Sequence, residues 1–322
     1  MTSVTPDTAA VHGTRLASGL GFAVASAVSF SLSGTLAVGL FASGWSPGAI
    51  VLVRVTLGAL VVLPLGIAAL RGDWGALRRN ARLLVAYGVL AVAGAQFCYF
   101  SAIQYMQVGP ALLIEYTAPA AVVGWMWARH GQRPGPVTLG GVAVAAAGLV
   151  LVLDVVSGAE LSAPGVAWAL AAMVGAATYF IINAKGDTGL PPLTLAAGGL
   201  VVGAVTLGIL GATGLMPLTG STAPAQYPTG QIPWWVALAV LGVVTAGMAY
   251  VTGIAAGRRL GSRLSSFVAL LEVVCAIGFA WLVLHELPRP IQLLGGVLIL
   301  AGVVAVQQGE RTTARRDAGS AA

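Results

Sequence analysis

Ten long apolar runs dominate the pattern of hydrophobic and polar positions along the 322-residue chain. Each run is about 20 residues long, the length at which a helix crosses a ~30 Å hydrocarbon core. The runs are continuous and do not alternate with polar residues, so they predict membrane helices rather than the strands of a barrel. The predicted spans are 17–41, 47–70, 82–105, 108–129, 136–154, 163–184, 191–211, 232–257, 262–284 and 290–307.

The composition supports an all-α membrane protein. Hydrophobic residues make up 58% of the chain and charged residues 8%, whereas about a quarter of the residues of a soluble domain are charged. The polar segments 1–14 and 309–322 have little apolar surface to bury, so we expect disordered tails there. Cys98 and Cys275 fall within apolar runs, where we expect buried small side chains without redox chemistry. Arginine far outnumbers lysine, a bias that we interpret as bacterial and that favours a bacterial plasma membrane.

The sequence contains an internal repeat. Residues 124–152 and 278–306 match without a gap at a constant offset of 154. The matched pairs include tryptophans, prolines and glycines: Trp127/Trp281, Pro134/Pro288, Pro136/Pro290, Gly141/Gly295 and Gly148/Gly302. Each copy contains the end of one span, a short polar hinge and a second span that starts at a proline. The repeated unit is therefore a pair of membrane helices.

The distribution of charge gives the copies a direction. With a cytoplasmic N-terminus, 14 of the 16 basic residues fall in cytoplasmic segments, as the positive-inside rule requires, and the C-terminus is cytoplasmic too. The net charge of +6 then reflects topology and contact with anionic lipid headgroups, not nucleic-acid binding. The two copies are spans four and five and spans nine and ten, so an odd number of spans separates them and they face opposite ways. We predict two inverted five-helix repeats, 15–155 and 156–308, an architecture typical of secondary transporters.

Three ionisable side chains lie inside predicted spans: Arg54, Glu115 and Glu272. Each costs on the order of 3 kcal/mol to insert, so each is a functional candidate. Arg54 and Glu115 lie at similar depths below the outer ends of their spans and can form a pair. Alternatively, Arg54 extends its guanidinium to the outer interface. Pro119 removes the helix hydrogen bond to the carbonyl of residue 115, which leaves an acceptor beside Glu115 for a polar ligand.

Glu272 lies nearer the midplane, where a carboxyl group can serve as a proton carrier. Both glutamates could instead form structural hydrogen bonds to neighbouring helices. Four polar side chains on other spans can line a cavity with them: Gln96, Tyr99, Tyr179 and Asn183. The alternative for these four is interhelical packing and hydrogen bonding.

The sequence lacks the motifs of several enzyme classes. The only lysine, Lys185, does not stand in a phosphate-binding loop, so ATP hydrolysis is not expected. His12, His130 and His285 lie in a tail or at span ends, which leaves an intramembrane zinc or serine protease without its histidines. We therefore predict that the chain is not an enzyme and has no metal or cofactor. The sequence indicates no oligomeric state.

Two motifs resemble the drug/metabolite transporter superfamily, specifically the EamA-type ten-helix exporters. One is the hinge Leu284-His285-Glu286-Leu287-Pro288 with the Gly- and Leu-rich span that follows it. The other, Glu115-Tyr116-Thr117-Ala118-Pro119, is similar to a motif of the threonine/homoserine exporter branch. The chain departs from the family pattern at Val273, where the family often has proline, and at His285, where it usually has glycine.

The resemblance implies export of a small metabolite, such as an amino acid or an amphipathic compound, by proton exchange or by facilitated diffusion. The expected mechanism is alternating access about a cavity between the two halves, with Glu115 and Glu272 as proton or cation sites. Uptake or simple facilitation by the same fold is one alternative. A membrane receptor or scaffold that transports nothing is another, and it predicts a core without a water-accessible cavity near Glu115.

Overall fold

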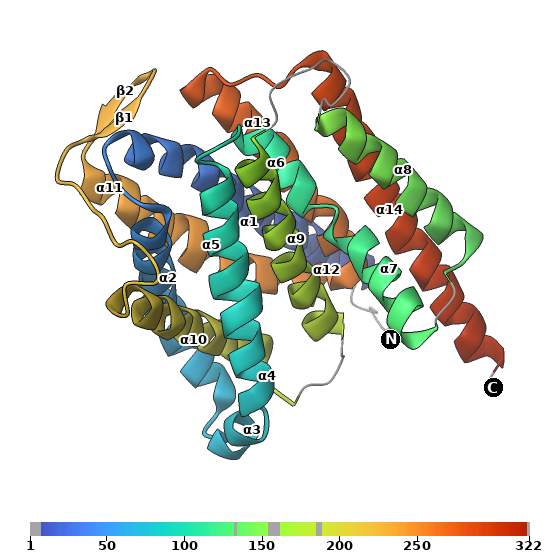
Figure 1. The fold of residues 1–322 in the computed structure, drawn as a ribbon. Coiled ribbons are helices and arrows are strands. Elements are labelled where there is room, and N and C mark those ends of the chain that lie inside the picture. Colours follow the sequence, from blue (N-terminus) through green and yellow to red (C-terminus); the bar gives the residue numbers. More distant parts are fainter. Residues whose placement is uncertain (1–7, 132–133, 154–161, 185–188, 321–322) are drawn as a thin grey trace.

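The computed structural model describes residues 8–131, 134–153, 162–184 and 189–320, and it is built almost entirely of helices (Figure 1). The α-helices and π-helices (η) of the first half are α1 (Thr8–Ala42), α2 (Pro47–Leu70), α3 (Trp74–Arg79), α4 (Ala81–Ala86), η1 (Tyr87–Gly94), α5 (Ala95–Ala102), α6 (Val108–Glu115), α7 (Ala118–His130) and α8 (Pro136–Val152). The second half contains α9 (Ala163–Ala184), α10 (Pro192–Ala212), β1 (Ala225–Tyr227), β2 (Gly230–Ile232), α11 (Trp234–Ala239), η3 (Val240–Met248), α12 (Ala249–Ala269), α13 (Leu271–Leu284) and α14 (Pro290–Ser320).

The predicted helical membrane protein is confirmed at this level, with differences in detail. In the described part of the chain, eight helical stretches are long and apolar enough to cross a membrane, and α8 and α13 are shorter apolar helices. The prediction of a loop between spans eight and nine is wrong, because α12 continues through residues 258–261 and the chain leaves the helix at Leu270. This segment contains no proline to stop the helix, and arginine and leucine favour helix.

Two further differences concern polar segments. Helix α1 begins at Thr8 and α14 continues to Ser320, so helix occupies residues 8–14 and 309–320 of the two tails that we expected to be disordered. The loop before α11 forms a two-stranded antiparallel hairpin, β1 and β2, and the chain is therefore not purely helical. Strands of only three residues are too short to leave a recognisable alternating pattern in the sequence.

Helices α8 and α14, the second members of the repeated pair, lie side by side (Figure 1). Four glycines bring their backbones together. A Cβ atom added at Gly148 would lie 2.6 Å from the carbonyl oxygen of Gly295, and one at Gly302 would lie 2.6 Å from that of Gly141. The helices run antiparallel, and the repeat-equivalent glycines exchange partners, as in a contact with two-fold symmetry.

Other local features recur in the two halves at positions that are 154 residues apart. The π-helices η1 and η3 end at Gly94 and Met248. The helical path is interrupted at Tyr116 and again at Leu270. Helices α7 and α13 are followed by left-handed residues, Gly131 and His285. Helix α2 packs on η3, and α10 packs on η1, so each half contacts the π-helix of the other.

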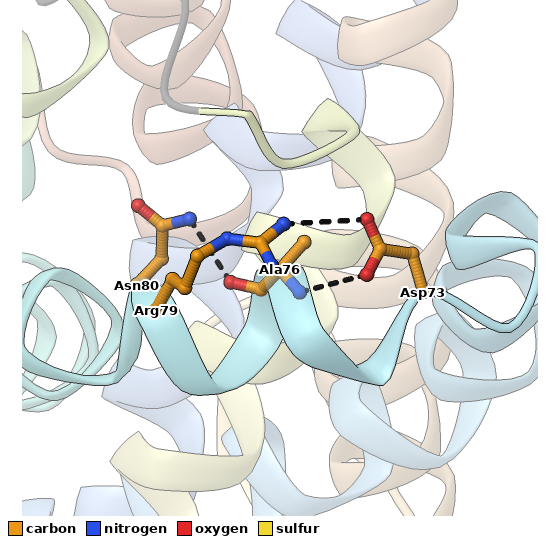
Figure 2. A network of polar contacts seen from close by, with 4 residues as sticks. All are labelled: Asp73, Ala76, Arg79 and Asn80. Carbon is orange, nitrogen blue, oxygen red and sulfur yellow. Dashed lines mark hydrogen bonds and ion pairs between the residues drawn. The ribbon is translucent and has the colours of Figure 1, made fainter.

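Short polar contacts shape the connections at the ends of the helices. Asp73 caps α3, where its side chain accepts a hydrogen bond from the backbone N–H of Ala76 at 2.9 Å. The same carboxylate pairs with Arg79 at 3.5 Å (Figure 2). Both side chains are well exposed, so this ion pair contributes little to stability.

The β hairpin is fastened to the end of α1. The Tyr227 hydroxyl donates a hydrogen bond to the carbonyl of Leu36 at 2.9 Å, and its ring fills the space beside Gly39, where an added Cβ would lie 2.2 Å from ring carbons.

We expect Tyr227→Ala to lower the free energy of unfolding by about 3 kcal/mol, because it leaves a void where the ring packs against Gly39. Tyr227→Phe should cost about 1 kcal/mol, for the hydrogen bond alone. Thermal unfolding in detergent checks both values, and equal shifts for the two variants would contradict the packing role of the ring.

Candidate functional site

A cavity of about 690 Å³ lies between α1, α2, α5, α6, α9, α12 and α13. Six of the seven side chains proposed from the sequence line it: Arg54, Gln96, Tyr99, Glu115, Tyr179 and Glu272. Asn183 belongs to α9, but its side chain lies outside the described residues. The fold thus brings these six polar groups together from five separate helices in one largely apolar cavity.

Arg54 is held by residues from both halves of the chain. Its Nε donates a hydrogen bond to the Thr245 hydroxyl at 3.1 Å, and Nη2 donates to the Thr245 carbonyl at 2.9 Å. Nη1 donates to the side-chain oxygen of Gln96, and the guanidinium lies over the ring of Phe100 at 5.4 Å. The proposed pair with Glu115 is not formed among the described residues, because these acceptors take the guanidinium instead. With only 3% of its surface exposed, Arg54 does not reach an interface either.

Gln96 belongs to this network, because its side-chain oxygen accepts the hydrogen bond from Arg54. Gln96 lines the cavity together with Tyr250 of the second half of the chain. Gln96 and Tyr250 are equivalent by the offset of 154, and each follows a π-helix by two residues. Such π segments often occur at functional sites. Here they precede two equivalent residues that both line the cavity.

The two carboxylates of the cavity differ in their partners. Glu272 accepts a hydrogen bond from the Tyr116 hydroxyl at 2.8 Å. Among the described residues, none donates a hydrogen bond to the Glu115 carboxylate. A carboxylate without donors in an apolar wall is costly. Glu115 is therefore the group of this cavity that most needs a ligand donor or a proton.

Both glutamates stand at helix breaks. Helix α6 ends at Glu115, and Thr117 forms a turn before α7 begins. The break comes just before Pro119, which occupies the second position of α7 rather than interrupting a continuous helix. The second break, at Leu270, places Glu272 in the first turn of α13 and forms without a proline. Span nine is therefore interrupted even though Val273 replaces the family's proline.

Several aromatic side chains that line the cavity were not predicted from the sequence. Tyr116, Phe30 and Phe180 all line the cavity. Tyr116 adjoins Glu115 in the motif, and this was the only available signal. An isolated phenylalanine in an apolar span gives none, because lipid-facing and cavity-facing phenylalanines look alike in sequence.

We expect Arg54→Lys to disrupt the site despite the conserved charge. Lysine cannot reproduce the planar set of donors that binds both oxygens of Thr245 and the oxygen of Gln96. Two or three lost charge-assisted hydrogen bonds should lower the free energy of unfolding by about 3 kcal/mol. Thermal unfolding in detergent measures this change. Arg82→Lys, at an exposed position on α4, is the matched control and should unfold like the wild type.

Comparison with known proteins agrees with this architecture. The model of the EamA-like transporter family matches twice, over residues 17–154 and 163–307. The threonine/homoserine exporter RhtA of Escherichia coli (strain K12) is 27% identical over 289 residues, which cover 88% of each chain. An uncharacterized transporter of Archaeoglobus fulgidus is 26% identical over 273 residues, 85% of this chain and 91% of that protein.

A solved crystal structure also has the same fold. It aligns with a TM-score of 0.60 at 21% identity and covers 93% of this chain and 99% of its own. The two matches to the family model together span most of the sequence. The chain belongs to the EamA-like transporter family and to the drug/metabolite transporter superfamily, and it is a multi-pass membrane transporter.

Proposed function

We propose that this transporter is a secondary exporter of small metabolites in a bacterial plasma membrane, with both termini in the cytoplasm. The observation that carries the proposal is the cavity itself, in which Glu115 and Glu272 stand at the breaks of two discontinuous helices. Discontinuous helices near the middle of the membrane form substrate and ion sites in secondary transporters.

The substrate proposed here is a small amino-acid-like or amphipathic compound with an amino group. Among the described residues that line it, the cavity has two carboxylates and a single guanidinium, and the three hydrogen bonds of this guanidinium already go to protein oxygens. An ammonium group supplies the donors that Glu115 lacks. Aromatic side chains such as Phe30 and Tyr179 offer apolar surface to the rest of the molecule. The relative named as a threonine/homoserine exporter supports the same class.

Alternating access between inverted five-helix repeats is the proposed mechanism. The antiparallel contact of α8 with α14 supports it, because repeat-equivalent glycines exchange partners across that contact. The reciprocal packing of α2 on η3 and of α10 on η1 supports it as well. A pseudo-two-fold relation of this kind gives two states of similar energy, in which the halves exchange their conformations.

Coupling to protons is proposed through Glu115 and Glu272, which would exchange a proton for the amino group of the substrate. Facilitated diffusion and uptake use the same cavity, and a reversed substrate gradient separates them from export. The receptor or scaffold alternative predicts a core without a cavity at Glu115, so the observed cavity favours transport. No step of this mechanism requires an enzyme activity or a cofactor.

The proposal is tested by overexpressing the chain in a bacterial host and measuring which amino compounds accumulate in the medium. We expect faster release, and raised resistance, for at least one amino acid or amphipathic amine. Cells that express Glu115→Gln at the same level are the control. If no compound is released faster than from these control cells, the exporter proposal is wrong.

A further inference from the structure

The cavity is closed at the hairpin end of the molecule by the N-terminus of α6. Along α1, the residues that line the cavity end at Ser33. At the next position, a Cβ added to Gly34 would lie 2.5 Å from the Tyr99 hydroxyl and 2.7 Å from a methyl group of Val108. No space for a side chain is left at Gly34. The cavity therefore ends at this position, where α1 packs directly against Tyr99 and Val108.

A second glycine continues this contact on the other side of α6. A Cβ added to Gly109 would lie 3.1 Å from Ile277 of α13 and 3.4 Å from Pro288 of the hinge that follows α13. The first turn of α6 is therefore packed between α1 and α13. Its residues Val108, Gly109 and Pro110 are all buried.

A carboxylate from the other half of the chain binds this helix end. Glu286 accepts a hydrogen bond from the backbone N–H of Val108 at 3.3 Å, whereas the side chain of the preceding residue, Gln107, provides no cap. A negative group at a helix N-terminus is favoured by the unpaired N–H groups and by the helix dipole. Burial raises the pKa of Glu286, and the hydrogen bond from Val108 lowers it, as expected for a carboxylate partly removed from water.

The position of Glu286 is fixed by the end of α13. His285 adopts a left-handed conformation with φ of 57°, and the backbone N–H of Glu286 donates to the carbonyl of Ala280 at 3.1 Å. These two features turn the chain sharply after α13 and aim the carboxylate back at α6. Glycine adopts this left-handed conformation most readily, which suits the glycine that the family pattern has at the position of His285.

The contact joins two separately packed groups of helices. Helix α1 packs on α12, α13 and η3, while α9 packs on α5, α6, α7 and η1. Opening the cavity at the hairpin end must separate α6 from α1 and α13. The opposite end of the cavity is lined by Ala23 of α1 and Gly257 of α12, beside Arg258 and Arg259, the basic end that is predicted to be cytoplasmic.

We propose that Glu286 is a latch that holds the outer side of the cavity closed by binding the N-terminus of α6, and that the latch opens when substrate leaves. The inference rests on the proposed transport function. Glu286 acts here as a positioning residue and is not part of the cavity. Releasing it should favour the outward-open state without changing the groups that bind substrate.

The test is the reactivity of a thiol inside the cavity toward a membrane-impermeant charged maleimide added to intact cells. The thiol is introduced by Ser33→Cys in a background with Cys98→Ala and Cys275→Ala. We expect Glu286→Ala to increase the labelling rate at least threefold. Gln292→Ala is the matched control, because the Gln292 side chain accepts a hydrogen bond from the Arg289 N–H of the hinge and donates one to the Val152 carbonyl, with no described hydrogen bond to α6. Its labelling should match the background.

A cross-link provides the converse experiment. In the same background with Ser33 retained, Gly109→Cys with Ile277→Cys should form a disulfide that stops efflux, and reduction should restore it. Unchanged labelling in a folded Glu286→Ala protein, or full efflux by the cross-linked protein, would overturn the latch. Labelling requires no substrate, so its failure is distinct from a failure of transport through Glu115.

Discussion

Replacing Glu115 by glutamine is expected to lower the rate of substrate efflux by roughly 10- to 100-fold. The substitution keeps the shape of the side chain but removes the charge that would bind an ammonium group or exchange a proton. A hydrogen bond to a charged group contributes about 1.5–3 kcal/mol, and each 1.4 kcal/mol is about tenfold in affinity. Initial rates of efflux from loaded cells, at equal protein expression, measure the effect.

The matched control is Asp73→Asn, which also neutralises a carboxylate. Asp73 lies at the start of α3 and pairs with Arg79 (Figure 2). Both side chains are well exposed, and neither lines the cavity. We expect it to export at the wild-type rate. If both variants lose activity equally, the effect would follow from net charge or expression and not from the cavity.

Leucine at Gly148 of α8 or at Gly302 of α14 is expected to cause a large loss of stability. At Gly148 a new side chain meets backbone atoms of Gly295 and Ile299 at 2.6 and 2.7 Å, and at Gly302 it meets backbone atoms of Ala145 and Gly141. Because backbone atoms cannot move aside as side chains do, the helices must separate. We expect a loss of about 3 kcal/mol for each variant, measured by thermal unfolding in detergent.

Gly140→Leu gives a control on the same helix, since no atom lies within 4 Å of a Cβ added there. It should unfold like the wild type. The pseudo-symmetry adds a stricter expectation, because Gly148 and Gly302 are equivalent by the repeat and their variants should lose similar stability. A large loss at Gly140 together with small losses at Gly148 and Gly302 would contradict the proposed packing.

The cavity could be predicted from the sequence to the extent that it depends on charged groups. Arg54, Glu115 and Glu272 stand out because an ionisable residue in an apolar run is costly and so needs a reason. All three line the cavity. The partners of Arg54 could not be predicted, because one acceptor is the backbone carbonyl of Thr245 in η3, and a π-helix leaves no recognisable pattern in an apolar run.

Helix boundaries were harder to predict where charge and helix propensity disagree. Arg258 and Arg259 predicted a loop by their charge, yet α12 continues through them. The break at Leu270 carries no proline or glycine and is visible only in the structure. It matters for function, because it places Glu272 in the first turn of a new helix rather than in the middle of a longer one.

The pair of tyrosines near the glutamates shows the same limit. Tyr99 was expected in the wall as a polar side chain within an apolar span, whereas Tyr116 was not expected there. Its hydroxyl nevertheless binds Glu272 from the other half of the chain. Contacts between halves depend on how the repeats pack, and the hydrophobic pattern of one span does not contain that information.

Flux through the purified protein in liposomes tests the central claim most directly. The compound identified by the efflux screen is loaded inside, and its release is followed with and without a pH gradient. We predict rapid release with the wild type, and release close to that of protein-free liposomes with the double variant Glu115→Gln/Glu272→Gln. A double variant that releases the compound at the wild-type rate and with the wild-type pH dependence would contradict the assignment of this cavity as the transport site.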